Sequence, residues 1–477
     1  MSIVNHLWFN ERVADKQIDK TRRMAEAKVF PLLIRMSGPA MFSMLIMSLY
    51  NIVDSLFVSA VSEIALRSVS IIFPVQQLMI AFAVGTSVGV NSYVARRLGA
   101  EDPETASAAA SHGLALSFVN WLFFLVTGSL MAPVVVNWFS NHGEVISSGI
   151  AYLRIVTVGS IGLFWQIHSE KIFQATGNMT RAMFIQLTGA VLNIALDPIL
   201  IFGWFGLPAM GVRGAAVATV VSQIIAGGAG VHLLLHREKV IKVRLRGFRF
   251  QKHILAAIYR VGLPSLVMQS VTAMVGMVFN MIILPFSEIA ITVLGVYLKL
   301  ESFVFMPVFG IGQGMLPLMA YNYGAKRFDR VRQTLKSGMI LMAGMMSFST
   351  VVFQLIPRLL LGAFNATEEM YEMGIPAFRN ISICFLFAGI AIILSISFQA
   401  LGRGTYSLFI SIFRQLVLLL PLARLFAVWH LDYVWYSYVI SDLGAALMAA
   451  FLFRRLSARI MPQEETSAIM AVEKDAA

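Results

Sequence analysis

The chain has very little charge for its length. Of its 477 residues only 13% are Asp, Glu, Lys or Arg and 58% are hydrophobic, whereas about a quarter of the residues in soluble domains are charged. This deficit excludes an ordinary soluble enzyme, a disordered protein and a fibrous protein. The single cysteine, Cys384, excludes a disulfide framework and a cysteine-based metal cluster. The sequence contains no P-loop, so ATP is not expected as an energy source.

Long apolar runs account for most of the sequence. A helix that crosses a bilayer needs about 20 mostly apolar residues, and twelve runs meet this requirement. The runs are 31–58, 66–95, 106–132, 148–174, 181–203, 211–235, 254–284, 289–321, 334–357, 374–401, 405–428 and 434–454. The pattern predicts an all-α polytopic membrane protein with twelve transmembrane helices.

Basic residues collect in every second gap between these runs. They are Arg96 and Arg97, Lys171 and Arg181, eight Lys or Arg within 237–260, Lys326, Arg327, Arg330, Arg332, Lys336, Arg403, Arg454, Arg455 and Arg459. The alternate gaps hold few, and 137–150 has none. Because cytoplasmic loops retain positive charge, we expect an inner-membrane protein with both termini in the cytoplasm. Nucleic-acid binding, which the formal charge of +12 would otherwise suggest, does not explain the alternation.

The sequence repeats itself at a fixed offset in residue number, the kind of self-similarity that reveals repeated architectures. Ser62-Glu63-Ile64-Ala65 recurs as Ser287-Glu288-Ile289-Ala290, so the offset is 287 − 62 = 225. Phe173-Gln174-Ala175 recurs as Phe398-Gln399-Ala400 in the same register. The glycines share it as well: Gly85, Gly89 and Gly99 correspond to Gly310, Gly314 and Gly324. Glycines at such spacing favour close helix packing.

The repeat predicts two pseudo-symmetric six-helix bundles. We expect a cytoplasmic amphipathic leader at 1–30, an N-terminal lobe at 31–235, a basic linker at 236–253, a C-terminal lobe at 254–456 and a cytoplasmic tail at 457–477. Repeats of this kind form transporters whose substrate path lies between the halves. A channel would need a filter or a ring of charge, and neither is evident in the sequence.

Several motifs resemble those of the multidrug and toxic compound extrusion (MATE) family, in its DinF/MepA-like branch. The similarity covers about residues 28–456. The matching stretches are Leu49–Asp54, Gly85 with Gly89, Ala95–Ala100, Leu192–Ile199, Gly214–Thr219, Pro307 with Gly310–Gly314, Tyr321–Lys326, and Phe413-Arg414-Gln415 with Pro421. The major facilitator superfamily shares the twelve-span plan, but its loop after span two has a different motif from Ala95–Asp102.

The resemblance implies a twelve-helix exporter rather than an enzyme. Such a protein expels cationic or lipophilic small molecules in exchange for inward Na⁺ or H⁺, by alternating access between two lobes. It uses no organic cofactor and functions as a monomer in the lipid bilayer. The alternative is a flippase or exporter of a lipid-linked or amphipathic metabolite on the same fold. Bending at Pro39, Pro264 and Pro307 could supply hinges.

Acidic residues within apolar runs are the main functional candidates, since burying a carboxylate at bilayer depth costs at least about 2.5 kcal/mol. Asp54 lies in the first run and Asp197 in the fifth. Asn193 lies four residues before Asp197 and so shares its helix face. Oxygen donors of these types suit a small cation. If runs four, five and six meet run one, Tyr152 and Thr219 complete this predicted ion-coupling site.

Other intramembrane polar residues are secondary candidates. Glu301 could contact a cation or substrate, or form a salt bridge to the helix that carries Arg414, while Lys299 faces away from it. His168, Glu170 and Lys171 fall near the end of run four. For the substrate cleft the sequence offers only guesses, chosen by depth: Gln77, Phe57, Met277 and Phe279. No spacing typical of a transition-metal site is present.

Overall fold

The computed structural model describes residues 21–139, 141–244 and 246–461, and these residues form helices and connecting loops without a strand. The predicted leader therefore lies largely outside the described residues, and the predicted tail does so beyond residue 461. Ten helices are long and apolar enough to cross a membrane, and two sharply bent helix pairs raise the total to twelve within the described chain. The twelve-span prediction is confirmed.

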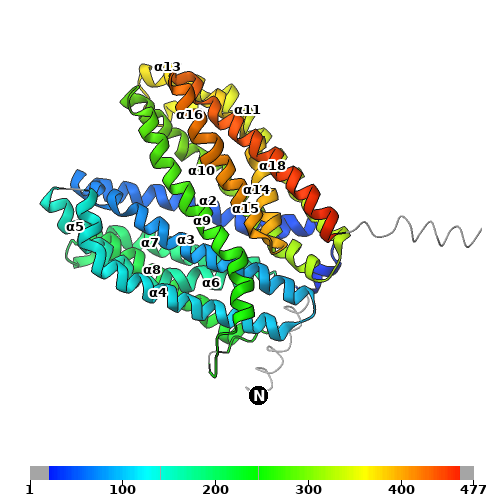
Figure 1. Ribbon diagram of the computed structural model, residues 1–477. Coiled ribbons are helices and arrows are strands. Elements are labelled where there is room, and N and C mark those ends of the chain that lie inside the picture. The colour runs from blue at the N-terminus through cyan, green and yellow to red at the C-terminus, as the bar shows by residue number, and fades with distance from the viewer. Residues whose placement is uncertain (1–20, 140, 245, 462–477) are drawn as a thin grey trace, which may run out of the picture.

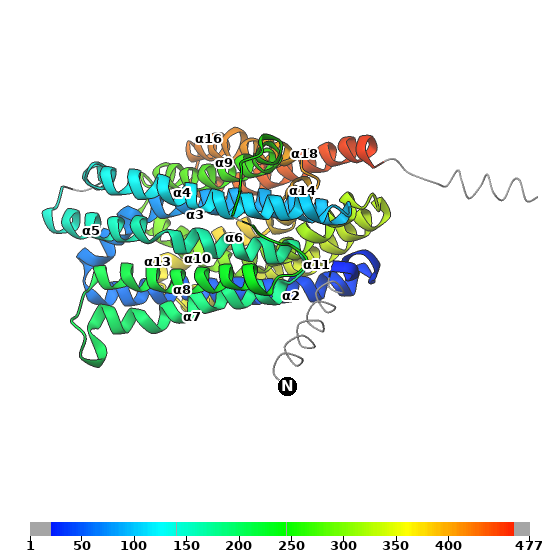
Figure 2. The same cartoon turned by 90° about the horizontal axis from the view of Figure 1, so that it is seen from below.

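Each half of the chain supplies six spans. The first half comprises α2 (Val29–Val61), α3 (Glu63–Gly99), α4 (Pro103–Phe139), the pair α5 (Gly143–Gly159) and α6 (Ile161–Ala175), α7 (Met179–Phe202), the short η1 (Trp204–Gly206) and α8 (Val212–Arg237). The second half comprises α9 (Lys252–Ile283), α10 (Glu288–Gly324), α11 (Phe328–Leu355), α12 (Pro357–Gly362), the pair α13 (Glu368–Ser382) and α14 (Phe385–Ala400), α15 (Gly404–Ile412), η2 (Phe413–Leu419), α16 (Leu420–Ala427), α17 (Leu431–Val434) and α18 (Tyr436–Ile460). Helices α3 to α8 lie together on one side of the molecule and α10 to α18 on the other, as Figure 1 shows. In Figure 2, seen from below, α7 and α8 lie in front of the paler α10 and α13.

The two sharp bends occupy equivalent places in the repeat. α5 and α6 meet at 45° around Ser160, and α13 and α14 meet at 46° around Cys384. Neither break contains a proline. The prolines proposed as hinges, Pro39, Pro264 and Pro307, each lie inside one continuous helix, so their role as hinges stays a prediction.

Glycines bring the two halves into close contact from the middle of α3 and α10 to the end of the bundle where both helices finish. A β-carbon on Gly85 of α3 would lie 2.7 Å from the β-carbon of Leu266 of α9. Its counterpart Gly310 of α10 faces Met41 of α2, where a β-carbon would lie 2.6 Å from the Met41 Cα. Since 266 − 41 and 310 − 85 both equal 225, the same contact is made twice.

Two further pairs repeat this symmetry. In the first, Gly89 packs against Gly262, and its counterpart Gly314 packs against Ser37. In the second, Gly99 packs against Tyr321, and its counterpart Gly324 packs against Arg96. In each case the offset of the repeat relates the two contacts. The glycines thus serve the close helix packing that the sequence predicted. Because Arg96, Arg97, Lys326 and Arg327 lie at this end, we call it the basic end and its opposite the distal end.

Polar contacts reinforce the junction at the basic end. The hydroxyl of Ser92 donates to the Gln399 carbonyl (2.5 Å), and Arg96 Nη1 donates to the Ala400 carbonyl (3.1 Å). Gln174 Nε2 of α6 donates to Gln313 Oε1 of α10 at 2.6 Å. The distal parts of α2 and α9 instead expose large apolar side chains, among them Leu56 (62%) and Met281 (67%). The lobes diverge toward the ends labelled α5 and α13 in Figure 1.

The segment between the halves is attached to α4 through its backbone. The N–H groups of Lys242 and Arg244 donate to the hydroxyls of Ser107 (3.1 Å) and Ser111 (3.0 Å). The N–H of Gln251 donates to His112 Nε2 at 2.8 Å. The predicted linker, 236–253, gives its first and last two residues to α8 and α9.

The glycine junction is testable by substitution. In a Cys384→Ser background, Ser37→Cys reports access to the junction, because Ser37 is 1% exposed and faces Gly314. We expect Gly310→Val to raise the rate of maleimide labelling at position 37 about tenfold, the change that a shift of about 1.4 kcal/mol toward a separated junction produces. Gly344→Val is the matched control, since a β-carbon there meets no heavy atom within 4 Å. An unchanged labelling rate in Gly310→Val would contradict the proposed close-packing requirement.

Candidate ion and substrate sites

Two aspartates from different helices interact inside the N-terminal lobe. Asp197 of α7 is fully buried, and Asp54 of α2 is half-buried. Their carboxyl groups lie close enough for each to act on the other as a like charge. Two carboxylates that approach each other inside a protein repel, and a bound proton or cation relieves that repulsion. The structure therefore brings together the two carboxylates that the sequence singled out.

Asn193 connects this pair to α8. In one orientation of its amide, the Asn193 nitrogen Nδ2 lies 3.4 Å from Asp197 Oδ1 and 3.4 Å from Thr219 Oγ1. With the amide turned over, its nitrogen donates to Asp197 Oδ2 (3.1 Å) and the Tyr50 hydroxyl (3.3 Å), and its oxygen accepts from the Thr219 N–H (3.1 Å). This second orientation satisfies both ends of the amide, and we adopt it. Asn193 and Asp197 share a helix face because they are four residues apart.

Tyrosines close the cluster on the sides of α2 and α5. Tyr50 precedes Asp54 by one turn of α2, and Tyr152 of α5 is 3% exposed. Both tyrosines interact electrostatically with Asp54 and Asp197. Gln76 of α3 donates to the Tyr152 hydroxyl at 3.2 Å. Tyr50 and Gln76 were not among the predicted site residues, although spacing of four residues from Asp54 could have found Tyr50.

The N-lobe cluster has the donor chemistry of a small-cation site. It presents two carboxyl groups, one amide and hydroxyls, which are hard oxygen donors. Neither carboxylate has a basic ion-pair partner among the described residues. The described chain also holds no group of three or more His, Cys, Asp or Glu side chains suited to a metal ion. The cluster can accept a proton or one small monovalent cation.

The C-terminal lobe carries a second buried polar cluster with a different charge balance. Arg414, on the π-helical segment η2, forms an ion pair with the fully buried Asp442 of α18. Glu301 of α10 accepts a hydrogen bond from the Tyr297 hydroxyl at 3.3 Å. It also lies close enough to Arg414 and Asp442 for their charges to act on its carboxyl group. The direct ion-pair partner of Arg414 is thus Asp442 rather than Glu301. Lys299 is exposed and lies away from this cluster, with its Nζ 5.9 Å from the centroid of the Phe364 ring.

The four residues guessed for a substrate cleft have different environments. Gln77 and Phe57 are half-buried, and the Phe57 ring packs edge-on against Phe202. Met277 is 45% exposed. Phe279 is 1% exposed and packs against Tyr438 with ring centroids 4.9 Å apart, so it faces the interior of its own lobe.

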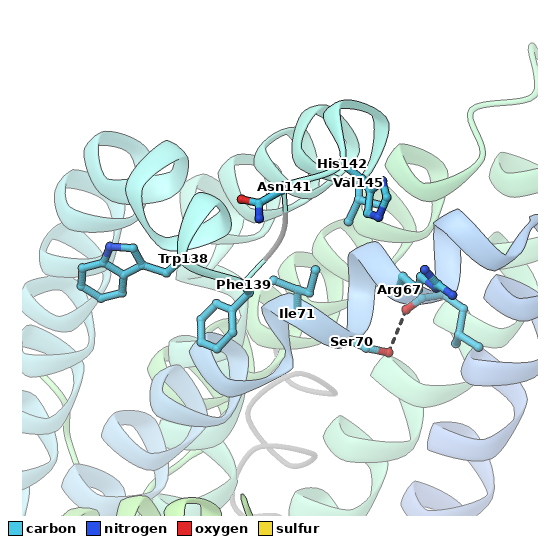
Figure 3. A pocket seen from close by; sticks show the side chains of 9 residues that line it. Arg67, Ser70, Ile71, Trp138, Phe139, Asn141, His142 and Val145 are labelled. Carbon is cyan, nitrogen blue, oxygen red and sulfur yellow. Dashed lines mark hydrogen bonds between the residues drawn. The ribbon is translucent and has the colours of Figure 1, made fainter.

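A surface pocket of about 670 Å³ lies at the distal ends of α3, α4 and α5. Figure 3 shows Arg67, Asn141 and His142 around it, with Trp138 and Phe139 on the α4 side. Ser70 turns back to its own helix and donates to the Leu66 carbonyl at 2.8 Å. None of the nine lining residues belongs to the aspartate cluster, so this pocket is separate from it.

A repeated twelve-span helical bundle, with charged groups buried inside each half, defines a polytopic membrane transporter. The sequence profile of the MatE family matches residues 39–199 and 264–425. The starting positions of the two matches differ by 264 − 39 = 225, which is the offset of the repeat. The chain therefore belongs to the MATE family of membrane transporters and is not an enzyme.

Relatives and solved structures agree with this assignment. The multidrug export protein MepA of Staphylococcus aureus (strain MSSA476) is 24% identical over 91% of this chain and 96% of its own length. A MOP superfamily transporter from Pyrococcus furiosus is 26% identical, with a TM-score of 0.86 over 92% of this chain and 98% of that one. A MATE transporter structure described as outward-facing matches with a TM-score of 0.87 and the same identity and coverage.

The C-lobe ion pair gives a stability prediction. Asp442→Leu leaves Arg414 without its buried partner, and breaking a buried pair typically destabilises a protein by about 3–5 kcal/mol. Because the Arg414 side chain is 27% exposed, we expect Asp442→Leu to lower the free energy of unfolding by about 3 kcal/mol, at the lower end of that range. The double variant Asp442→Leu/Arg414→Met should recover most of the lost stability, because the charge left without its buried partner is removed as well. Thermal unfolding in detergent measures the stability of the single and the double variant. An equal loss of stability in the two variants would contradict this account.

Proposed function

We propose that this protein is a secondary active efflux antiporter, which exports cationic or lipophilic small molecules in exchange for inward Na⁺ or H⁺. The membership in a transporter family and the similarity to MepA proteins named for multidrug export support the substrate class. The alternation of basic loops supports an inner-membrane location with both termini in the cytoplasm. On this assignment the basic end faces the cytoplasm, and the protein works as a monomer without an organic cofactor.

The observation that carries this proposal is the approach of Asp54 to the buried Asp197, close enough for the two charges to act on each other. Two carboxylates that meet in a low-dielectric interior repel each other unless a proton or a cation lies between them. Asn193, Thr219 and Tyr152 supply further polar groups around the pair. Occupancy by the coupling ion would therefore draw α2 toward α7, and an empty site would push them apart. This gives the ion a different affinity for two arrangements of α2, as coupling requires.

Transport then proceeds by alternating access. With the basic end closed by the glycine junction, substrate leaves and the ion enters at the distal end. Ion binding at Asp54 and Asp197 shifts α2, which also forms the junction through Ser37 and Met41. The ion site and the lobe junction thus share one helix. Opening of the basic end releases the ion inward and admits the next substrate.

Substitution of the two aspartates tests the role of the pair. Asp54→Asn and Asp197→Asn keep the side-chain size but remove the charge, so each should abolish ion-driven efflux while the protein still inserts in the membrane. Asp102→Asn is the matched control, because Asp102 lies outside the spans, where it caps the start of α4 through the Thr105 N–H (3.0 Å) and pairs with Arg97 (3.5 Å). The readout is efflux from proteoliposomes together with yield in the membrane fraction. Normal efflux in both site variants would end the coupling assignment and favour a flippase.

The coupling ion can be identified in inverted vesicles. We expect export of ethidium or a fluoroquinolone to be driven by an imposed gradient of sodium or of protons, but not by both. Transport that is independent of both gradients, yet saturable, would contradict antiport. Transport that does not saturate would indicate a channel.

A further inference from the structure

The aspartate pair is one end of a file of buried polar side chains that continues toward the basic end. Asp197, Asn193 and Gly189 follow one face of α7 at intervals of four residues, or about 6 Å per step. A β-carbon placed on Gly189 would lie 3.1 Å from Oε1 of Gln166 on α6. The absent side chain at position 189 therefore lets the Gln166 amide reach the face of α7 that carries the aspartate.

From Gln166 the file continues along α6. Gln166, Glu170 and Gln174 are also spaced by four residues, and their exposed fractions are 7%, 6% and 3%. Gln166 Nε2 donates to Glu170 Oε1 at 3.0 Å. At the far end, Gln174 receives a hydrogen bond from Lys171 Nζ (3.0 Å) and donates to Gln313 of the other lobe (2.6 Å). The file thus runs from the acidic pair to the lobe junction.

Glu170 is the only titratable carboxylate in this file apart from the aspartate pair. Lys171 is the one charged group that acts on it among the described residues. As sequence neighbours their side chains point about 100° apart around the helix, and they form no direct hydrogen bond, since each binds a glutamine instead. Arg181, the next cation toward the basic end, pairs with Glu238 at 3.2 Å. Glu170 is therefore available to gain and lose a proton.

Buried polar atoms without a partner occur around α6, the helix that carries Glu170. Of the buried side-chain atoms that have no hydrogen-bond partner within the described structure, three lie in the N-terminal lobe: Asn91 Oδ1, His168 Nε2 and Ser169 Oγ. Their residues are at most 1% exposed. Asn91 also approaches the Gln174 amide at 3.5 Å, while His168 and Ser169 lie on α6 immediately before Glu170. Buried polar atoms of this kind bind ordered water, which can carry a proton between side chains that are not in contact.

The part of the file that contains Glu170 and Gln166 exists in one lobe only, whereas Gln174 at the lobe junction recurs as Gln399. The offset of 225 places Ala391, Ser395 and Ile396 at the positions of Gln166, Glu170 and Lys171, and Phe279 and Leu422 at those of Asp54 and Asp197. A merely structural polar ladder would have no reason to accompany the aspartate pair. Glu170 and the aspartate pair occur together in the N-terminal lobe, and all three carboxylates are replaced in the C-terminal lobe.

We propose that Glu170 is a proton-binding residue on the route between the Asp54–Asp197 pair and the basic end. A proton leaves the shared carboxyl pair, crosses by water to the Glu170 carboxylate, and leaves Glu170 at the basic end once the junction opens. The nearby Lys171 ammonium disfavours a metal cation at this position. The proposal rests on the antiport function and narrows its coupling ion to the proton.

The test separates net proton-driven transport from exchange in proteoliposomes. Net efflux driven by a pH gradient needs proton release inward, whereas exchange of substrate for substrate at equal pH does not. Glu170→Gln should slow pH-driven efflux at least tenfold, a modest part of the roughly 10²–10⁴-fold that a positioned acid or base supplies, while exchange stays within about twofold. Glu104→Gln, at an exposed carboxylate on α4, is the control and should change neither.

Several outcomes would overturn the proposal. These are wild-type pH-driven efflux in Glu170→Gln, parallel loss of efflux and exchange in a correctly inserted protein, or efflux by the wild type that follows sodium alone. If Glu170→Gln does not insert, Glu170→Asp replaces it; retained coupling with a shifted pH profile supports the proposal and an unchanged profile contradicts it. Failure of the antiport assignment is distinguishable, because it appears as normal efflux in Asp54→Asn and Asp197→Asn.

Discussion

The contact of helix backbone against helix backbone at the basic end is the constraint on which the rest of the structure depends. Gly85 and Gly310 each occupy a place where a β-carbon would collide with the opposite lobe, and the two contacts are related by the repeat. Packing of this kind is close but involves small surfaces, since glycine contributes no side chain. It favours a junction that can part and re-form, because close-packed interfaces switch between discrete arrangements more readily than they deform. The polar contacts of Ser92 and Arg96 go to backbone carbonyls and do not tie the junction to one charged partner.

The symmetry of the junction contrasts with the asymmetry of the buried charges. In the C-terminal lobe, Arg414 pairs with Asp442 and leaves the cluster with one carboxylate in excess, Glu301. In the N-terminal lobe, Asp54 and Asp197 meet with no cation from the described chain between them. Only the second arrangement changes its net repulsion strongly when a proton or small cation binds. A symmetric junction combined with a charge-sensitive site in one half gives a coherent basis for coupling ion movement to the exchange of access.

Much of this architecture was predictable from the sequence because hydropathy and repeats are properties of the chain itself. The twelve spans agree with the helices, and the glycines predicted close helix packing, which the structure places between the two lobes. The pairing of Asn193 with Asp197 followed from their spacing, but the approach of Asp54 depends on how α2 packs against α7, which no local pattern encodes. The contribution of Gln76 to the aspartate cluster was not predicted, because the side of α3 that faces Tyr152 depends on how the helices pack. The bends at Ser160 and Cys384 lack the proline that would mark them.

The most direct test is to measure distances between the lobes at both ends of one protein by double electron–electron resonance. Spin labels at the exposed positions Glu104 and Gln333 report the basic end, and labels at Glu144 and Glu369 report the distal end, in a Cys384→Ser background. The account predicts reciprocal changes: as substrate or the coupling ion is varied, a longer distance at the basic end accompanies a shorter one at the distal end, and Asp54→Asn/Asp197→Asn removes the response to the ion. Distances that stay fixed at both ends during active transport, or that lengthen together, would contradict it.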